Sequence, residues 1–235
     1  MLHSLKYGEK RMIVDMLTRE HGRVEFIVSV SHSAKAKIRK QFFQPLTMLE
    51  IECDLRQRVQ LQRLREVRIV HPYATIPFDQ YKLSLLFFIA EVLSASTRGE
   101  QQNQNLYDYV EASMLWLDGC PGSYANFHLV FMMRLTRFIG FLPNIEGYRE
   151  GDVFDIRAAE FTSAAPLHRD FIAAADAARI STLMRMNYDT MHLFRMSRDD
   201  RNRIVDVLLT YYKMHVPNFP ELRSLAVVKQ LFEDK

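Results

Sequence analysis

The spacing of hydrophobic residues changes once along the chain, and this change restricts the folds that the sequence can adopt. In the first third, Val24, Phe26, Val28 and Val30 alternate with residues of the opposite face, which is typical of a half-buried β-strand. From Asp79 onward, hydrophobic residues recur at helical spacing instead. The sequence therefore predicts a β-rich first part and a helical second part.

Further short strands are expected before His71-Pro72, which closes the β-rich region. Residues 12–17 alternate in the same way, as do Leu49, Ile51 and Cys53, and residues 59–69 supply more β-compatible material. Four or five short strands in about seventy residues, without a long helix, fit a small closed sheet such as a barrel. We therefore expect a first domain at residues 1–72.

Helical spacing, capping residues and stops at glycine or proline predict several helices in a second domain, residues 73–235. The expected helices begin at Asp79 or run over about 106–117, 123–140, 173–186, 197–215 and 221–232. Residues from about 144 to 170 lack sustained periodicity, so we interpret them as an irregular excursion with one hairpin at most. The expected fold class is α+β, with a small β-barrel followed by an all-helical bundle domain.

The net charge of +3 is unevenly distributed along the chain. Residues 1–70 carry 14 Lys and Arg against 8 Asp and Glu, whereas the remaining residues carry 17 against 20. A basic first third suggests a polyanionic partner, although ordinary surface charge is an equally good explanation. No apolar run is long enough to span a membrane, and the first residues do not resemble a signal peptide. We expect a cytoplasmic protein that does not enter the membrane.

The usual motifs of catalysis and cofactor binding are missing from the sequence. It contains no G-x-S-x-G, no Walker A motif and no G-x-G-x-x-G. The eight histidines are scattered, and the two cysteines are too few for a four-thiolate metal site. We therefore expect a protein that is not an enzyme and that holds neither a cofactor nor a metal.

The strongest candidate for a binding site is a basic segment at residues 31–40, which contains four cations and no acid. Phe42 and Phe43 follow at once, and arginines continue through residues 56–68 with only Glu66 among them. Cations neutralise phosphates and aromatic faces stack on bases, so this composition favours nucleic acid. The alternative is a solvated basic loop with phenylalanines of the core. The candidate DNA-binding residues are Lys35, Lys37, Arg39, Lys40, Arg56 and Arg58.

Three groups of residues follow one another in an order and at a spacing that are informative together. The first is LKYGE at residues 5–9 with TREHGR at 18–23, and the second runs from Phe127 through Leu135 to GFLP at 140–143. The third is LTYYKMH at residues 209–215 with LRSL at 222–225. Over nearly the whole chain, these groups resemble the RecO family of bacterial recombination mediators.

The resemblance implies an oligonucleotide-binding (OB-fold-like) barrel and a helical domain. It also implies a DNA repair and recombination mediator that binds and anneals single-stranded DNA. Such a mediator helps load recombinase onto strands covered by the single-stranded DNA-binding protein. The implied partners are single-stranded DNA, RecR and the acidic C-terminal tail of the single-stranded DNA-binding protein. The alternative is a protein–protein interaction module without direct DNA binding.

A pocket for an acidic tail that ends in phenylalanine needs an apolar hole and a cation. The helix that ends near Gly140 offers both, in Arg134, Arg137, Phe138 and Phe141. The alternative is that the two arginines only solvate the outer face of a core helix.

The sequence departs from the family pattern after Pro143. Many relatives carry a four-cysteine zinc site there, whereas this chain has no cysteine in the excursion. We therefore expect that zinc is absent and that Phe154, Ile156 and Phe161 hold the excursion together.

Overall fold

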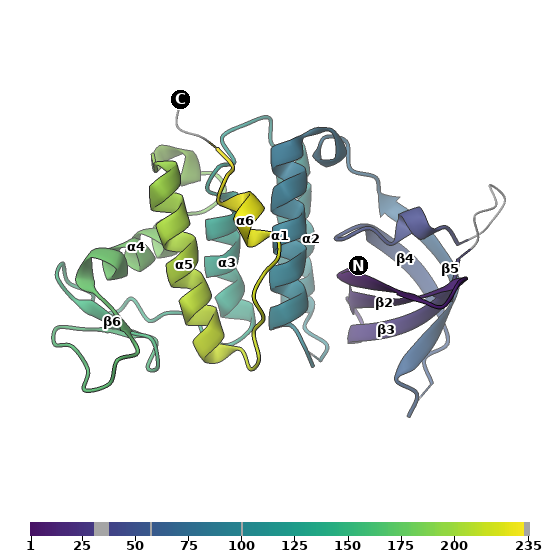
Figure 1. Cartoon of the computed structure of the whole chain (residues 1–235), viewed down its shortest axis with the longest axis horizontal. Coiled ribbons are helices and arrows are strands. Elements are labelled where there is room, and N and C mark those ends of the chain that lie inside the picture. The colour runs from purple at the N-terminus through teal and green to yellow at the C-terminus, as the bar shows by residue number, and fades with distance from the viewer. Residues whose placement is uncertain (31–37, 57, 100, 233–235) are drawn as a thin grey trace. The chain divides into compact units, whose positions relative to one another are not determined.

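The computed structural model describes residues 1–30, 38–56, 58–99 and 101–232. The chain forms two compact units, Met1–Gly119 and Cys120–Lys235. Figure 1 shows the strands of the first unit in purple and blue, followed along the chain by helices. This order confirms the α+β class. The first unit contains the sheet together with the next two helices, so the expected domain boundary at residue 72 stays a prediction.

The sheet of the first unit consists of β1 (His3–Tyr7), β2 (Arg11–Thr18), β3 (Gly22–Ser29), β4 (Met48–Cys53) and β5 (Leu61–His71). The strand order is β1-β2-β3-β5-β4. The β3–β5 pair is parallel, and the other three pairs are antiparallel. Five strands in a partly open barrel are the hallmark of the OB-fold. The expected OB-fold-like barrel is therefore confirmed.

Alternation along β2 and β3 places one face of each strand in the barrel core, as the sequence predicts. Met12, Val14 and Met16 are buried there together with alternate residues of β3. Phe43 follows the short 3₁₀ helix η1 (Lys40–Phe42), is only 2% exposed and packs in the same core. For Phe43 the core interpretation is therefore right, and its ring offers no surface for base stacking.

The helical elements of the first unit are η2 (Ile76–Phe78), α1 (Gln80–Ser96) and α2 (Gln104–Gly119). The side chain of Asp79 caps α1, because it accepts hydrogen bonds from the backbone N–H groups of Tyr81 at 2.9 Å and Lys82 at 3.2 Å. This confirms the cap that the sequence predicts. The helix buries an apolar face that includes Leu85, Phe88, Ile89 and Leu93.

The second unit contains α3 (Phe127–Phe138), β6 (Val153–Asp155), β7 (Glu160–Thr162), β8 (Phe171–Ile172), α4 (Ala174–Arg185), η3 (Met191–Leu193), α5 (Arg198–His215) and α6 (Leu225–Val228). Helix α3 packs against α4 and α5. The prediction of one helix over residues 221–232 is wrong in length, since α6 covers only Leu225–Val228. Before it, the backbone N–H of Leu225 bonds to the carbonyl of Leu222 in a tighter turn. None of the described helices is long and apolar enough to cross a membrane.

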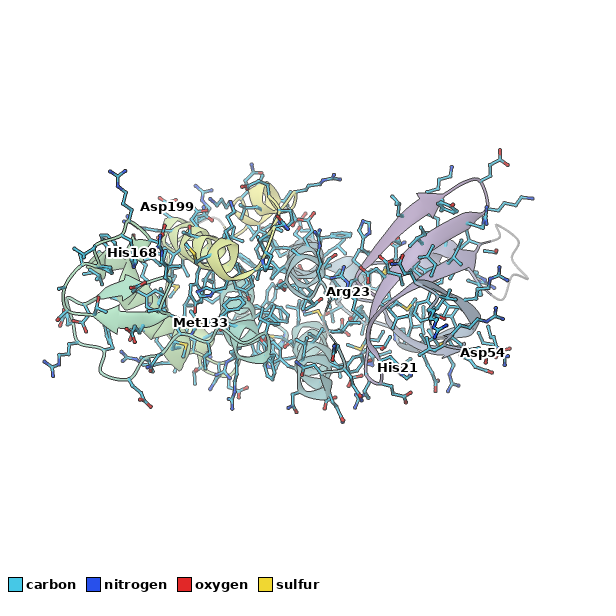
Figure 2. The ribbon with its side chains drawn as sticks, turned by 90° about the horizontal axis from the view of Figure 1, so that it is seen from below. His21, Arg23, Asp54, Met133, His168 and Asp199 are labelled. Atoms are coloured by element: carbon cyan, nitrogen blue, oxygen red, sulfur yellow. The ribbon has the colours of Figure 1, made fainter. Side chains whose placement is uncertain are left out.

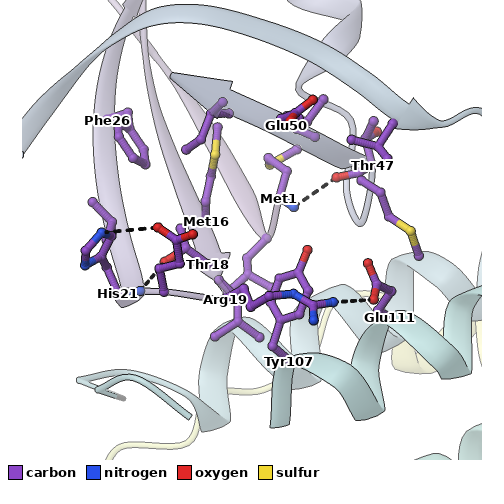
Figure 3. Close-up of a pocket in the computed structure, with 18 of the residues that line it drawn as sticks. Met1, Met16, Thr18, Arg19, His21, Phe26, Thr47, Glu50, Tyr107 and Glu111 are labelled. Atoms are coloured by element: carbon purple, nitrogen blue, oxygen red, sulfur yellow. Dashed lines mark hydrogen bonds and ion pairs between the residues drawn. The ribbon is translucent and has the colours of Figure 1, made fainter. Parts of the chain in front are cut away.

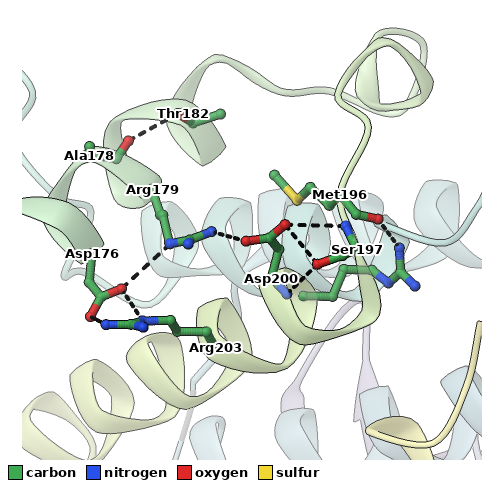
Figure 4. Close-up of polar contacts among 9 residues, drawn as sticks. Asp176, Ala178, Arg179, Thr182, Met196, Ser197, Asp200 and Arg203 are labelled. Carbon is green, nitrogen blue, oxygen red and sulfur yellow. Dashed lines mark hydrogen bonds and ion pairs between the residues drawn. The ribbon is translucent and has the colours of Figure 1, made fainter. Parts of the chain in front are cut away.

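Ion pairs hold α4 and α5 together in the second unit (Figure 4). Arg179 donates to Asp200 at 2.8 Å, and Arg203 donates to Asp176 at 2.5 Å. Ser197 accepts a hydrogen bond from the backbone N–H of Asp200 at 3.1 Å, and the Asp200 side chain accepts one from the backbone N–H of Ser197 at 3.3 Å, so the two residues form a capping box at the start of α5.

The excursion at residues 144–170 contains the β6–β7 hairpin. The side chains of Phe154 and Ile156 are buried, and the ring of Phe154 lies 5.0 Å from the ring of Phe161. These three residues therefore pack within or beside the hairpin as expected. His168 reinforces the packing, because its Nε2 lies 3.2 Å from a carboxylate oxygen of Asp155 (Figure 2).

Candidate nucleic-acid interface

The structure places the predicted DNA-binding residues in two different loops of the barrel. Arg39 and Lys40 are exposed at the start of η1, between β3 and β4. Arg56 and Arg58 are exposed in the loop that connects β4 with β5. Lys35 and Lys37 lie outside the described residues. The DNA-binding role of all six residues stays a prediction.

A buried glutamine orders the β4–β5 loop. Gln62 is 7% exposed, and its amide accepts a hydrogen bond from the backbone N–H of Arg56 at 2.9 Å. The same amide donates to the carbonyl oxygens of Arg56 at 3.0 Å and Val59 at 2.5 Å. Arg58 has a φ of 68°, a left-handed conformation that is uncommon for arginine. These bonds hold the backbone at Arg56 and Val59, while the side chains of Arg56 and Arg58 are exposed to solvent.

Two of the arginines that follow in β5 are balanced by acids in β4 or directly after it. Arg68 bonds to Glu50, and Arg65 bonds to Asp54, which Figure 2 labels at the edge of the barrel. Arg65 also lies 3.9 Å from Glu52. The sequence interpretation counted only Glu66 against these arginines, and it is wrong because antiparallel pairing brings the acids of β4 alongside.

Arg63 is exposed like Arg65 and Arg68, but unlike them it has no ion-pair partner within the described ranges. The strand registers pair Leu5 with Ile13, Ile13 with Ile27, and Ile27 with Arg63. Directly paired residues share a face of the sheet. These four side chains therefore form one row on the outer face of β1, β2, β3 and β5.

A second row lies beside the first and includes an exposed aromatic ring. The registers pair Tyr7 with Arg11 and Arg11 with Ser29. The guanidinium carbon of Arg11 lies 5.3 Å from the centre of the Tyr7 ring, a cation–π arrangement. Tyr7 is 48% exposed, and Leu5 in the first row is 56% exposed. We call the two rows together the outer face.

The outer face was missed by the sequence reasoning, although a signal for it exists. Leu5 and Tyr7 are two positions apart in β1, and Arg11 and Ile13 are two positions apart in β2, so each pair lies on one face of its strand. The pairing of the two strands is needed to bring the four side chains together. At its other end, the same sheet surface contacts α1. Arg23 of β3 bonds to Asp15 and donates to the backbone carbonyl of Ser94 at 2.7 Å (Figure 2).

The outer face offers both kinds of group that single-stranded nucleic acid requires. Cations neutralise phosphates, and exposed aromatic or apolar side chains receive unstacked bases. The outward surface of strands 2 and 3 is also where OB-folds bind oligonucleotides. Among the described residues, no three His, Cys, Asp or Glu side chains are grouped to hold a metal ion, and the absence of zinc stays a prediction.

The predicted partner-binding residues lie at the end of α3 and just beyond it. Arg134 and Arg137 are both exposed, and Arg134 donates to the backbone carbonyl of Met186 at 2.8 Å. Phe138 is half-buried. The ring of Phe141 is 9% exposed and stacks on His215 with 5.1 Å between the ring centres. Phe141 thus belongs to the core of its unit, and the partner-binding role of the four residues stays a prediction.

Comparison with known proteins identifies the family. The family model described as "Recombination protein O N terminal" matches residues 1–73, and "Recombination protein O C terminal" matches residues 77–226. The chain is similar to "DNA repair protein RecO" of Phocaeicola vulgatus, with 49% identity over 99% of this chain and 96% of the relative. It is also similar to proteins of that name from Bacteroides fragilis, at 46% identity, and Flavobacterium psychrophilum, at 30%. The alignments cover 99% of this chain and 97% and 96% of those relatives. The chain therefore belongs to the RecO family of DNA repair proteins.

Proposed function

We propose that the protein binds single-stranded DNA on the outer face of its barrel and anneals complementary strands during repair. The observation that carries this proposal is the outer face itself, where Tyr7 and Leu5 are exposed beside Arg11 and Arg63. Bases of a single strand stack on such side chains irrespective of sequence. The exposed arginines of the β4–β5 loop and the cations near η1 extend the surface along the phosphate backbone.

Annealing follows from the same properties. A protein that neutralises phosphates lowers the repulsion between two complementary strands. Contacts to phosphates carry no base information, so the bases of a bound strand can remain available for pairing. The protein thus acts by binding in the cytoplasm and needs no catalytic group for this role.

A titration of a labelled oligothymidine at two salt concentrations tests the proposal. We expect binding that weakens steeply with salt, by about 0.7 log units of affinity per log unit of salt for each phosphate contact. Double-stranded DNA of the same length is the control, because it offers phosphates without unstacked bases. Absence of oligonucleotide binding at both salt concentrations would contradict the proposal and favour a protein–protein interaction module.

We further propose that the protein helps load recombinase at strands covered by the single-stranded DNA-binding protein, with RecR as a second partner. Arg137 supports contact with an acidic tail, because it is exposed at the end of α3. The test is a labelled acidic peptide ending in phenylalanine, titrated against wild type and an Arg134→Ala, Arg137→Ala double variant. The expected loss is about 1.5–3 kcal/mol per charged hydrogen bond. Unchanged affinity would place the tail site elsewhere.

A further inference from the structure

The first unit contains a cavity of about 870 Å³ that the DNA-binding proposal does not use (Figure 3). One wall is β4 with the preceding residues, and another is the inner side of β2 and β3, including Met16 and Phe26. Tyr107, Val110 and Met114 of α2 complete the lining. The cavity is thus an apolar groove that runs along β4, and we call it the β4 groove.

Strand β4 lies at the end of the sheet order, and its ladder in the described part of the chain is with β5 alone. Just before the strand, the backbone N–H of Leu46 donates to the carbonyl oxygen of Met1 at 2.8 Å. The amino nitrogen of Met1 donates to the carbonyl oxygen of Thr47 at 3.1 Å. These two hydrogen bonds join Met1 to Leu46 and Thr47, and they end before the first residue of β4. An edge strand with unpaired backbone groups is a template for a further strand.

The lining of the β4 groove suits an adaptable apolar contact. It includes four methionines, and unbranched thioether side chains adjust to partners of different shape. Two aliphatic side chains of the lining are exposed, because Val70 is 60% and Leu55 is 38% solvent-accessible. The barrel core does not cover these two side chains, so they are available to a partner.

The charged residues of the lining are mainly acidic, since four glutamates stand against two arginines. Both arginines are paired with glutamates of the lining, because Arg19 lies 2.7 Å from Glu111, and also 3.0 Å from Asp108, while Arg68 bonds to Glu50. The excess negative charge of the lining is therefore that of Glu20 and Glu52. Burial lowers the pKa of the Met1 amino group to about 5, so this group adds no positive charge at neutral pH. The excess charge therefore attracts a cationic partner.

From this combination we propose that the β4 groove binds an extended peptide segment in which apolar residues alternate with lysine or arginine. The segment adds a strand to the free edge of β4, its apolar side chains enter the groove, and its cations meet the glutamates. A second copy of this chain fits less well, because pairing two β4 edges would bring Glu50 and Glu52 of both copies together. The inference is independent of the DNA-binding proposal.

The probe is a fluorescein-labelled peptide, Lys-Val-Lys-Leu-Lys-Phe-Lys-Val-Lys, titrated against the full chain. A peptide with the same composition, but with its lysines at one end and its apolar residues at the other, controls for charge alone. We expect saturable binding of the alternating peptide and at least several-fold weaker binding of the control. Equal affinity for the two peptides would overturn the proposal, because general attraction to acidic surface would then explain the binding.

Variants locate the peptide on the protein. Val70→Ser and Leu55→Ser remove exposed methyl groups at the groove, and each should weaken binding roughly fivefold to tenfold. Leu193→Ser is the matched control, since Leu193 is an aliphatic residue of η3 that is 68% exposed and does not line the groove. Loss of affinity in this control, or no loss in the two groove variants, would overturn the assignment.

Hydrogen exchange tests strand addition directly. Bound peptide should slow amide exchange in β4, residues 48–53, in wild type. Peptide binding without added protection in β4 would overturn strand addition. Sedimentation of the free protein tests whether a second copy of the chain occupies the groove instead. A dimer that dissociates in Val70→Ser would show this and would contradict the proposal.

Discussion

The carboxylate of Asp118 accepts a hydrogen bond from the backbone N–H of Thr75, with 2.8 Å between oxygen and nitrogen. The same carboxylate accepts the N–H groups of Ala74 at 2.8 Å and Ile76 at 3.0 Å. Burial acts to raise the pKa of Asp118, but the hydrogen bonds outweigh it and leave the pKa below its ordinary value. The end of α2 thus fixes the segment that joins β5 to α1.

Replacing this carboxylate should destabilise the protein. In Asp118→Asn, an amide NH₂ faces backbone N–H donors and at least one buried donor loses its acceptor. We expect the free energy of unfolding to fall by about 1–3 kcal/mol, as measured by urea denaturation at neutral pH. Asp108→Asn is the control on the same helix, because the side chain of Asp108 is 46% exposed and its ion pair with Arg19 contributes about 1 kcal/mol at most. An equal loss in both variants would contradict the role given to Asp118.

His128 of α3 should make the stability sensitive to acid. Burial, with a smaller contribution from the positive charge of Arg201, lowers the pKa of His128 from 6.5 to about 3. The unfolded chain therefore takes up a proton below pH 6.5, whereas the folded protein does not until about pH 3. The contribution of this pKa difference to the free energy of unfolding is fully present above pH 6.5. It falls as the pH decreases, by about 2 kcal/mol between pH 7 and pH 5.

The comparison with His128→Gln isolates this effect, because every other titrating group is shared by the two proteins. Urea denaturation at pH 7 and pH 5 should show a smaller loss in the variant, by about the 2 kcal/mol that His128 contributes. The variant can be less stable at both pH values without affecting the test. The same pH dependence in both proteins would show that His128 is not responsible.

Local signals were sufficient to predict much of the fold. The alternation in β2 and β3 and the caps at Asp79 and Ser197 depend on residues close in sequence, and all are found in the structure. The prediction of a helix at residues 221–232 was wrong because it also relied on a local pattern alone. A few apolar residues at helical spacing do not distinguish a helix from turns that happen to bury the same side chains, here around α6.

The candidate site was less predictable, because it depends on strand pairing. Arg63 and Arg65 look alike in the sequence, but Arg65 lies at a shift in the β4–β5 ladder and bonds to Asp54, the residue after β4. Likewise, Arg63 joins Ile27 on the outer face through a parallel pair of strands that are separated by a long connection. Such registers depend on turns and irregularities that one sequence does not specify, including two shifts in the β4–β5 ladder.

Tyr7 should act as a stacking surface for a base. Tyr7→Ala should weaken oligothymidine binding by about 1–3 kcal/mol, whereas Tyr7→Phe, which keeps an aromatic ring, should bind nearly as wild type. The ring is exposed, so neither change should unfold the barrel. The dependence of affinity on salt should remain unchanged, because no phosphate contact is removed. Equal losses in the two variants would refute stacking and point to the hydroxyl group.

The basic loops should contribute affinity without sequence preference. A variant with alanine at Lys35, Lys37, Arg39, Arg56 and Arg58 should bind single-stranded DNA more weakly and depend less on salt. The loss should be similar for unrelated sequences, since phosphate contacts carry no base information. Thermal unfolding should change little, because exposed substitutions usually alter stability by about 0.5 kcal/mol or less. Wild-type affinity in this variant would refute the assignment.

The most direct test of the outer face compares two arginines that stand two positions apart on β5. Arg63→Ala and Arg65→Ala change the net charge equally, but of the two only Arg65 is paired with acids, Glu52 of β4 and Asp54 just after it. We predict that Arg63→Ala weakens oligothymidine binding and makes the slope of log affinity against log salt shallower by about 0.7, while Arg65→Ala changes both much less. Equal effects of the two substitutions, or none from Arg63→Ala, would contradict DNA binding on the outer face.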